Sequence, residues 1–217
     1  MPSGLKCALF FTRARVYIYA GAFALFCARP ALAVIDPNVV ISTNAAALGN
    51  SDPKVRAAAA IELARFHATA KVPALAAQFA NEKDPKVRKA IVISLSNLGA
   101  PAADALVQAL TDKDTEIRAI AVAGLGNLGA ATALRDRLAK ETDDGVKQTL
   151  IFWLGQLKDD ASSDAIGAAL KDGNANTRAQ AAHALGFIGT EKAKGHLRSR
   201  TDETDPKVRR VIDTNKG

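Results

Sequence analysis

The sequence has almost no cysteine, and its two cysteines, Cys7 and Cys27, both lie within the first 33 residues. The rest of the chain therefore offers no disulfide, no thiol nucleophile and no thiolate metal site. A chain without thiols is well suited to an oxidising compartment, where a stray thiol is a liability.

Aromatic residues are also scarce. Phe, Tyr and Trp together make up 5% of the 217 residues, whereas alanine is abundant. This composition favours closely packed helices over a sheet, because strands are typically rich in aromatic and β-branched side chains. The length is sufficient for one or two ordinary domains.

Positive charge is concentrated at the beginning of the chain. The formal net charge is +7, but Lys6, Arg13, Arg15 and Arg29 lie in the first 33 residues, which contain no acidic residue. Removing these four from the 29 basic residues leaves 25 against 22 acidic residues, a net charge of +3. A net charge this small is weak support for a nucleic-acid partner.

Residues 1–33 have the features of a secretory signal peptide. A basic segment precedes an apolar run at 16–28, and Ala31-Leu32-Ala33 supplies the small residues that favour cleavage after Ala33. The run has about 13 residues, fewer than the roughly 20 that a helix needs to cross a bilayer, although an uncleaved anchor remains the alternative. We therefore expect residues 34–217 to be periplasmic or secreted, without stable membrane insertion once the leader is removed.

A five-residue motif, Asp-Pro-Lys-Val-Arg, organises the rest of the sequence. It occurs unchanged at Asp52, Asp84 and Asp205. Degraded copies begin at Asp114, Asp143 and Asn174. Successive starts are separated by 32, 30, 29, 31 and 31 residues. A period this regular indicates a repeat protein.

Each copy carries the signals of a helix start and a helix end. Asp is a good N-cap, and Pro at the first helical position loses no hydrogen bond, since its missing N–H would have had no partner. Counted from this Asp as zero, positions +3, +7, +11 and +14 are mostly apolar and share one helical face. Gly99, Gly129 and Gly189, at +15, supply the left-handed residue that ends a helix.

These signals predict alternating longer and shorter helices. The longer helices are predicted at 52–66, 84–98, 114–128, 143–157, 174–188 and 205–215. A first helix is predicted at 37–48, and shorter amphipathic helices at 70–81, 102–111, 131–140, 161–171 and 191–200. Each helix pair has one apolar stripe and too little area to fold alone, so neighbouring pairs must stack into an all-α solenoid.

This pattern resembles HEAT repeats, specifically the short HEAT-like repeats named after phycobilisome lyases. The resemblance rests on the Asp-Pro-x-Val-Arg starts, on Ala-x-x-x-Leu pairs such as Ala59 and Leu63, and on the terminal Leu-Gly or Ile-Gly, and it covers essentially all of residues 34–217. It implies a right-handed α-α superhelix, armadillo-like, of about six helix pairs with the longer helices on the concave wall. The family includes scaffolds, enzyme subunits and adaptors, so its function is left open.

The repeated Asp and Arg residues have a structural interpretation. Each Asp caps its own helix, and the Arg four residues later is expected to reach the Asp of a neighbouring repeat, which gives a ladder along the stack. The predicted ladder residues are Asp52, Arg56, Asp84, Arg88, Asp114, Arg118, Arg178, Asp205 and Arg209. A row of arginines that holds an acidic ligand is the functional alternative.

The sequence shows no catalytic constellation. His67, His183 and His196 are not followed by Glu, so the His-Glu ligand pairs of the di-iron hydroxylases among related HEAT-repeat proteins are missing, and we expect no metal site. No Ser lies in a Gly-x-Ser-x-Gly turn. The Gly-x-Gly-x-x-Gly at 124–129 falls in and at the end of a predicted helix, which favours helix packing over phosphate binding. We therefore expect a protein that is not an enzyme and has no cofactor.

The face opposite the apolar stripe is the remaining candidate site. It carries apolar residues at +9 and amides at +13, and an amide row can pair with the backbone of an extended peptide, as in the related armadillo repeats. The predicted partner-binding residues are Ile61, Arg65, Ile93, Asn97, Asn127, Phe152, Gln156, His183 and Phe187. Apolar side chains on a face that should meet water are unexpected. The alternative is that curvature buries the +9 residues between neighbouring repeats.

The preferred interpretation is an exported, non-catalytic scaffold that binds a protein or peptide on its concave face. A lyase-like enzyme or enzyme subunit that handles a prosthetic group is the first alternative, and it would retain an absorbing cofactor. Nucleic-acid binding is the second. It is less favoured, because Glu116, Gly145 and Asn176 interrupt the basic residues of the predicted inner helices and because the protein is expected to be exported.

Overall fold

The computed structural model describes residues 36–217, so the predicted signal peptide at 1–33 lies outside the described residues. Residues 36–217 form twelve α-helices and three short 3-10 helices and contain no strand. The α-helices are α1 (Pro37–Ala47), α2 (Pro53–Arg65), α3 (Val72–Asn81), α4 (Pro85–Leu98), α5 (Ala103–Ala109), α6 (Thr115–Asn127), α7 (Ala131–Leu138), α8 (Asp144–Gln156), α9 (Ser163–Ala169), α10 (Ala175–Ile188), α11 (Glu191–Ser199) and α12 (Pro206–Asn215). The 3-10 helices are Thr69–Lys71, Ala100–Ala102 and Asp160–Ser162. Each predicted helix is present, with both ends within two residues of the prediction.

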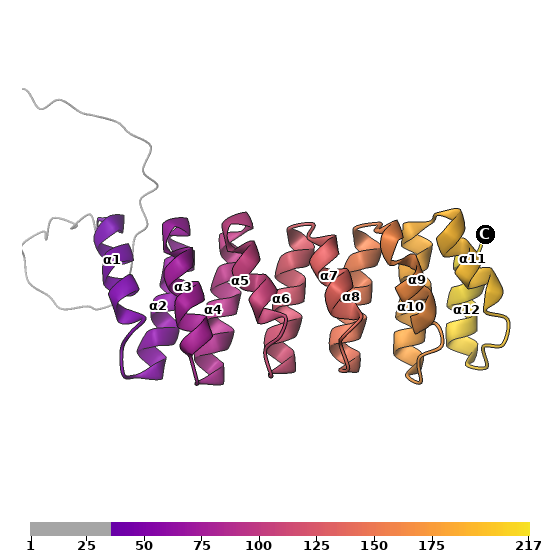
Figure 1. Cartoon of the computed structure of the whole chain (residues 1–217), viewed down its shortest axis with the longest axis horizontal. Coiled ribbons are helices and arrows are strands. Elements are labelled where there is room, and N and C mark those ends of the chain that lie inside the picture. Colours follow the sequence, from indigo (N-terminus) through magenta and orange to yellow (C-terminus); the bar gives the residue numbers. More distant parts are fainter. Residues whose placement is uncertain (1–35) are drawn as a thin grey trace, which may run out of the picture. The chain divides into compact units, whose positions relative to one another are not determined.

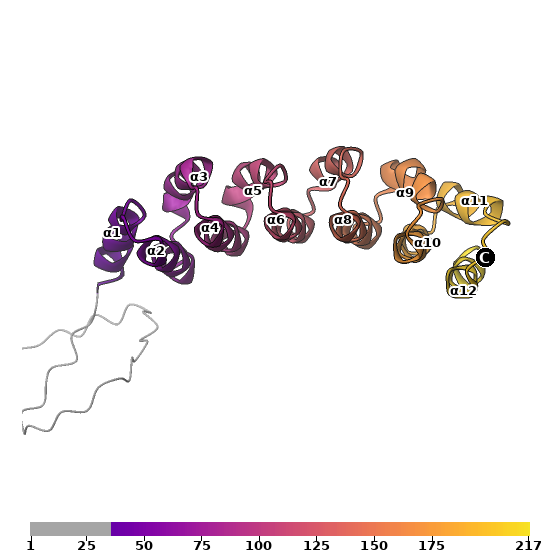
Figure 2. The same ribbon diagram turned by 90° about the horizontal axis from the view of Figure 1, so that it is seen from below.

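The helices of residues 36–217 form two layers (Figure 1 and Figure 2). Consecutive even-numbered helices from α2 to α12 pack against one another, and the odd-numbered helices cover them from one side. Figure 2 shows the even-numbered helices on the inner side of a shallow curve, and we call them the inner layer. The other helices form the outer layer. The predicted all-α solenoid is thereby confirmed.

Each inner helix begins at the N-cap that the motif predicts. The carboxylate of Asp52 accepts a hydrogen bond from the Lys54 N–H at 2.8 Å, and that of Asp84 accepts one from the Lys86 N–H at 2.8 Å. Equivalent caps are made by Asp114, Asp143, Asn174 and Asp205. Each cap satisfies an N–H group that has no partner within its own helix.

Position +15 follows the inner helices with a positive φ in five copies of the repeat. Gly99, Gly129 and Gly189 have φ of 75°, 72° and 70°, as predicted. His67 and Lys158 stand at the same position in their copies and have φ of 49° and 50°. A side chain in the left-handed region costs roughly 1–2 kcal/mol, so these two copies carry strain that glycine avoids in the other three.

The core lies between the two layers and is made by the predicted apolar stripe. The leucines at +11 are fully buried: Leu63, Leu95, Leu125, Leu154 and Leu185. They meet buried anchors of the outer layer: Leu75, Leu106, Leu134, Ile166 and Leu197. Each such side chain contributes about 1.5–3 kcal/mol by leaving water. No single helix pair has enough of them to be stable alone, which is why the pairs stack.

Neighbouring inner helices approach closely where a small residue at +12 faces position +10 of the next copy. A Cβ added to Gly126 would lie 2.1 Å from Cδ2 of Trp153, and a Cβ added to Gly155 would lie 2.8 Å from Cα of Ala184. Both glycines are therefore required by packing. For Gly126 this agrees with the interpretation of the Gly-rich segment at 124–129 as a packing feature.

Candidate functional site

The basic residue at +4 of each of the first five inner helices, α2 to α10, makes an ion pair with the following copy. Arg56 Nε donates to Glu82 Oε2 at 2.7 Å, and Arg118 Nε donates to Glu141 Oε2 at 2.9 Å. The other pairs are Arg88–Asp112, Lys147–Asp172 and Arg178–Glu203. We call these five ion pairs the rungs. They run along the turns that precede the inner helices and tie each repeat to the next.

The carboxylate of each rung is not the predicted one. We expected Arg56 to reach Asp84, the cap of the next helix, but Arg56 pairs with Glu82, which stands at position −2 of that copy. The capping oxygen of Asp84 is already bound to its own helix. Glu82 is the better partner because it also accepts the Asp84 N–H at 3.0 Å, which fixes the turn. The capping aspartates are therefore not rung partners.

Three rungs lower the pKa of their carboxylates, those of Glu82, Glu141 and Glu203. The hydrogen bond from the Arg56 guanidinium lowers the pKa of Glu82 to about 2. Burial acts to raise the pKa of Glu141, but Arg118, Arg137 and nearby backbone N–H groups outweigh it, and the pKa is lowered to about 2. Paired and charged in this way, these groups stabilise the stack. Because the rung arginines are bound to carboxylates within the chain, they offer no row of open cations to an acidic ligand.

The nine predicted partner-binding residues all lie on the inner layer and are all exposed. The large apolar members are Ile61, Ile93, Phe152 and Phe187, with exposed fractions of 46%, 38%, 41% and 53%. The polar members, likewise exposed, are Arg65, Asn97, Asn127, Gln156 and His183. We call these nine residues the inner-wall row. Curvature does not bury the four apolar members, but their role in binding a partner stays a prediction.

The amides of the inner-wall row have unused hydrogen-bonding capacity. The side chains of Asn97, Asn127 and Gln156 make no hydrogen bond to any part of residues 36–217. They come from α4, α6 and α8, which are consecutive inner helices. A carboxamide presents one acceptor and two donors, the same groups that a peptide backbone needs.

Phe152 is held in place by its neighbour. Its ring meets the ring of Trp153 edge to face, with centroids 5.5 Å apart and planes at 77°. Trp153 is half-buried and rests on Gly126 of the preceding inner helix. An aromatic ring that is both exposed and supported by packing is well suited to contact a partner, because little side-chain freedom is lost on binding.

Basic residues form no continuous row on the inner layer. Lys54 and Lys86 are exposed at +2, but Glu116, Gly145 and Asn176 occupy the next three copies. Lys89 makes an ion pair with Glu116, which lies in the next repeat. A phosphate backbone would therefore meet an interrupted set of charges along this wall.

The three histidines lie on separate elements. His67 follows α2, His183 belongs to the inner-wall row, and His196 Nε2 in α11 lies 3.1 Å from Asp164 Oδ1 in α9. Within residues 36–217, no three His, Cys, Asp or Glu side chains are close enough to hold a metal ion. None of the helices described is both long and apolar enough to cross a membrane.

Sequence reasoning missed a hollow in the outer layer. It has a volume of about 640 Å³ and is lined by residues of α5 and α7, among them Val107 and Arg135. Arg135 Nη1 donates to Asp159 Oδ1 at 2.6 Å, whereas Asp159 Oδ2 is buried without a hydrogen-bond partner in the described part of the chain. The one sequence feature that points to this hollow is Val107, an apolar residue that is not among the predicted core positions.

The sequence and the fold were compared with known proteins. A family model described as HEAT repeats matches residues 41–126 and 131–213. No curated protein matches the sequence. One similar structure is an engineered protein, with a TM-score of 0.54 and 18% identity over 81% of this chain and 94% of that chain. Another is the complex of CpcE and CpcF of phycocyanin lyase from Nostoc sp. PCC7120, with a TM-score of 0.53 and 18% identity over 68% of this chain and 99% of that chain. At these identities the likeness shows the fold alone.

Proposed function

The chain belongs to the HEAT-repeat family, and on that premise we propose that it is a non-catalytic scaffold that binds an extended protein segment along the inner-wall row. One observation carries the proposal. Exposed large apolar side chains and unpaired amides lie together on consecutive inner helices, at positions that the repeat does not need for its own packing. Exposed apolar groups that gather on one face of a soluble protein mark interaction sites.

The spacing of the inner helices suits an extended ligand. Packed helices lie about 8–10 Å apart, and an extended chain advances about 3.3 Å per residue, so about three ligand residues pass each repeat. The amides of Asn97, Asn127 and Gln156 would hold the ligand backbone. Ile61 and Ile93 at one end of the wall, and Phe152 and Phe187 at the other, would receive apolar side chains of the ligand. Backbone bonds give affinity in such a mode, and the apolar contacts give specificity.

The proposed setting is outside the cytoplasm, after removal of residues 1–33. Support comes from the sequence of the leader and from the absence of cysteine in the rest of the chain. The measurement is the N-terminal residue of the protein recovered from fractionated cells. The proposal requires Val34 as the first residue in the exported fraction. A full-length chain retained with the membranes would support the uncleaved anchor instead.

The inner-wall row is tested with peptides selected from a random library on the wild-type protein. We expect Ile93→Asp to weaken binding of the selected peptides at least about tenfold, because a charge replaces an apolar contact. Val107→Asp is the matched control, since Val107 is similarly exposed, at 42% against 38% for Ile93, but belongs to the outer layer. Equal loss of binding in both variants would exclude the inner wall as the site.

The same protein preparation separates the two alternative functions. A lyase-like subunit that handles a prosthetic group predicts an absorbing cofactor that stays bound through purification. Nucleic-acid binding predicts retention on heparin that falls steeply with salt. A colourless protein that elutes from heparin at low salt supports the scaffold.

A further inference from the structure

The last copy of the motif has a rung residue without a carboxylate. Arg209, at +4 in α12, makes no ion pair within residues 36–217, and its side chain is exposed. At the rung of Arg118, Nε and Nη2 hold Glu141, while Nη1 donates to the carbonyl oxygen of Asp112. In Arg209, Nε and Nη2 both donate to the carbonyl oxygen of Glu203, with Nε at 2.9 Å. The two groups that hold the carboxylate elsewhere thus rest on a backbone oxygen here.

The outward face of α12 also differs from the faces that receive a following repeat. Position +8 is fully buried under the next copy in the five preceding inner helices. These residues are Ala60, Val92, Val122, Ile151 and Ala182. In α12 the same position is Asp213, which is exposed. A carboxylate at this point would be costly to bury against another apolar helix, so α12 does not offer the packing surface that the earlier copies offer.

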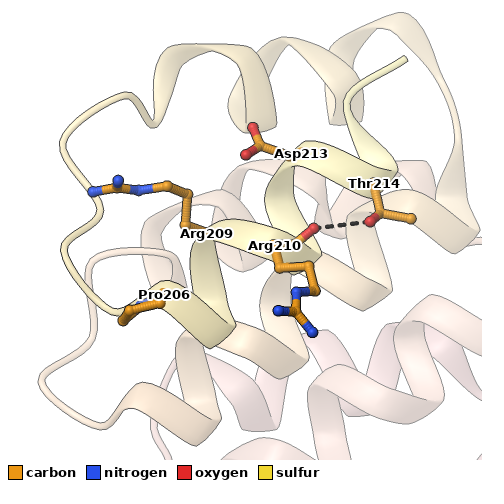
Figure 3. Close-up of a pocket in the computed structure, with 5 residues that line it drawn as sticks. All are labelled: Pro206, Arg209, Arg210, Asp213 and Thr214. Carbon is orange, nitrogen blue, oxygen red and sulfur yellow. Dashed lines mark hydrogen bonds between the residues drawn. The ribbon is translucent and has the colours of Figure 1, made fainter.

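Instead, α12 presents an open hollow lined mostly by charged and polar residues. The hollow has a volume of about 430 Å³, and Figure 3 shows the five residues that line it. They are Pro206, Arg209, Arg210, Asp213 and Thr214. Arg209 and Arg210 extend from the helix in different directions (Figure 3). The Thr214 hydroxyl donates to the carbonyl oxygen of Arg210 at 2.8 Å, so the two guanidinium groups are the principal donors of the hollow. That of Arg209 rests on the carbonyl oxygen of Glu203 through Nε and Nη2.

The charge of the described chain is concentrated at this end. Residues 36–189 contain 17 basic and 17 acidic side chains, whereas residues 190–217 contain eight basic and five acidic ones. The entire net charge of +3 therefore belongs to the last helix pair. A neutral body with one positive end attracts and orients an acidic partner at that end.

We propose that the outward face of α12 is a docking site for an acidic protein segment. One carboxylate of the partner takes the place at Arg209 that Glu141 takes at Arg118. On binding, Nε and Nη2 leave the carbonyl oxygen of Glu203 to Nη1, the arrangement seen in Arg118, and become a bidentate pair of donors. Arg210 and Lys207 add attraction without a fixed geometry. The site lies away from the inner-wall row and does not depend on the function proposed for that row.

The probe is a fluorescent octaglutamate peptide, and the measurement is its fluorescence anisotropy with the full chain. We expect Arg209→Gln to weaken binding about tenfold, the loss of one bidentate charged pair. Arg209→Lys keeps the charge but loses the bidentate geometry, and should fall between the wild type and Arg209→Gln. Lys86→Gln removes the same charge from an exposed site in a middle repeat and should weaken binding less than about twofold.

Three results would overturn the proposal. These are an absence of octaglutamate binding, equal weakening by Arg209→Gln and Lys86→Gln, and tighter binding of a DNA oligonucleotide of equal charge. The last result would make the positive end a nucleic-acid surface. Ile93→Asp should leave octaglutamate binding unchanged, and Arg209→Gln should leave binding of the library-selected peptides unchanged. Failure of one site is therefore distinguishable from failure of the other.

Discussion

Arg118 and Asn127 lie on the same helix, α6, and differ in their relation to the rest of the chain. Arg118 is buried, holds Glu141 of the next copy with two donors and uses a third on a carbonyl oxygen. Asn127 is exposed and makes no side-chain hydrogen bond within residues 36–217. Position +4 is basic in all six copies, whereas +13 reads Arg, Asn, Asn, Gln and Phe along the stack.

The difference separates two tasks on one set of helices. Where the copies agree, the chain satisfies its own donors and acceptors, and the residues hold the stack together. Where the copies differ, hydrogen-bonding groups and apolar surface are not used within the stack and remain exposed to solvent. Changes at the first kind of position should therefore act on stability, and changes at the second kind should leave stability almost unaltered.

Acid should weaken the rungs of Glu82 and Glu141 together, and the resulting loss of stability is the largest effect that we expect. The pKa of Glu82 and of Glu141 is lowered to about 2 in the folded protein from the usual 4.5. Depressed carboxylate pKa values stabilise the fold fully above about pH 4.5, and this stability is lost as the pH falls from there towards about 2. Urea midpoints measured across this range should fall steadily below about pH 4.5. A midpoint unchanged down to about pH 2 would contradict the role given to the rungs.

Removal of one rung carboxylate should have the next largest effect. Glu141→Ala leaves the buried Arg118 without its partner, and we expect the free energy of unfolding to fall by about 3–5 kcal/mol. The companion variant adds Arg118→Met, which removes the uncompensated charge and should recover part of the loss. Urea unfolding followed by circular dichroism measures both. Without any recovery in the double variant, the loss would have to be assigned to packing.

The close approach of inner helices can be tested by adding a single methyl group. In Gly126→Ala the new Cβ meets the ring of Trp153, and we expect a loss of about 1–3 kcal/mol with a change in Trp153 fluorescence. Gly195→Ala is the matched control, because Gly195 is also helical but a Cβ there meets no atom within 4 Å. The control should gain about 0.5–1 kcal/mol in helix stability. Loss in both variants would argue against a specific contact.

The positive-φ position offers a change that should stabilise the protein. Lys158→Gly removes a side chain from a residue with φ of 50°, and we expect a gain of about 1 kcal/mol in the free energy of unfolding. The reverse change, Gly129→Lys at the same position of the preceding copy, should cost a similar amount. Thermal unfolding measures the gain in stability of the first variant and the loss in the second. A loss of stability in Lys158→Gly would show that the side chain makes a contact that outweighs the strain.

The inner-wall row should show the smallest effect on stability. Asn127→Ala is expected to change the free energy of unfolding by less than about 0.5 kcal/mol, as is usual for exposed residues without partners. The same variant should weaken binding of the library-selected peptides. A stability change as large as that of the rung variants would place Asn127 among the structural residues. The distinction between positions +4 and +13 would then fail.

Much of the fold could be predicted because its determinants are local. The caps, the apolar stripe and the glycines at +15 each act within one helix, and the period then dictates stacking. The rung partners were predicted wrongly, although Glu82, Glu141 and Glu203 stand at −2 of their copies and carry a signal in the sequence. That signal gains meaning only when two copies are placed side by side, since the pair joins residues in different repeats.

The site was harder to derive than the fold. Exposure of the inner-wall row followed from helical geometry, because +9 and +13 lie opposite the stripe. The hollow beside Asp159 and the polar face of α12 did not follow, since both depend on how far apart neighbouring helices come to rest. The identity of a partner could not be predicted from this sequence, because it depends also on the surface of another molecule.

The inner helices pack on one another throughout, whereas α3, α5 and α7 pack chiefly on the inner layer and little on each other. Bending of this part of the stack would therefore change the gaps between α3, α5 and α7 more than the rungs and the Gly126–Trp153 contact. The distance from one inner helix to the next should stay nearly constant as the molecule flexes. If the inner-wall row binds an extended ligand as proposed, a constant distance between inner helices would favour ligands whose apolar side chains have the same spacing.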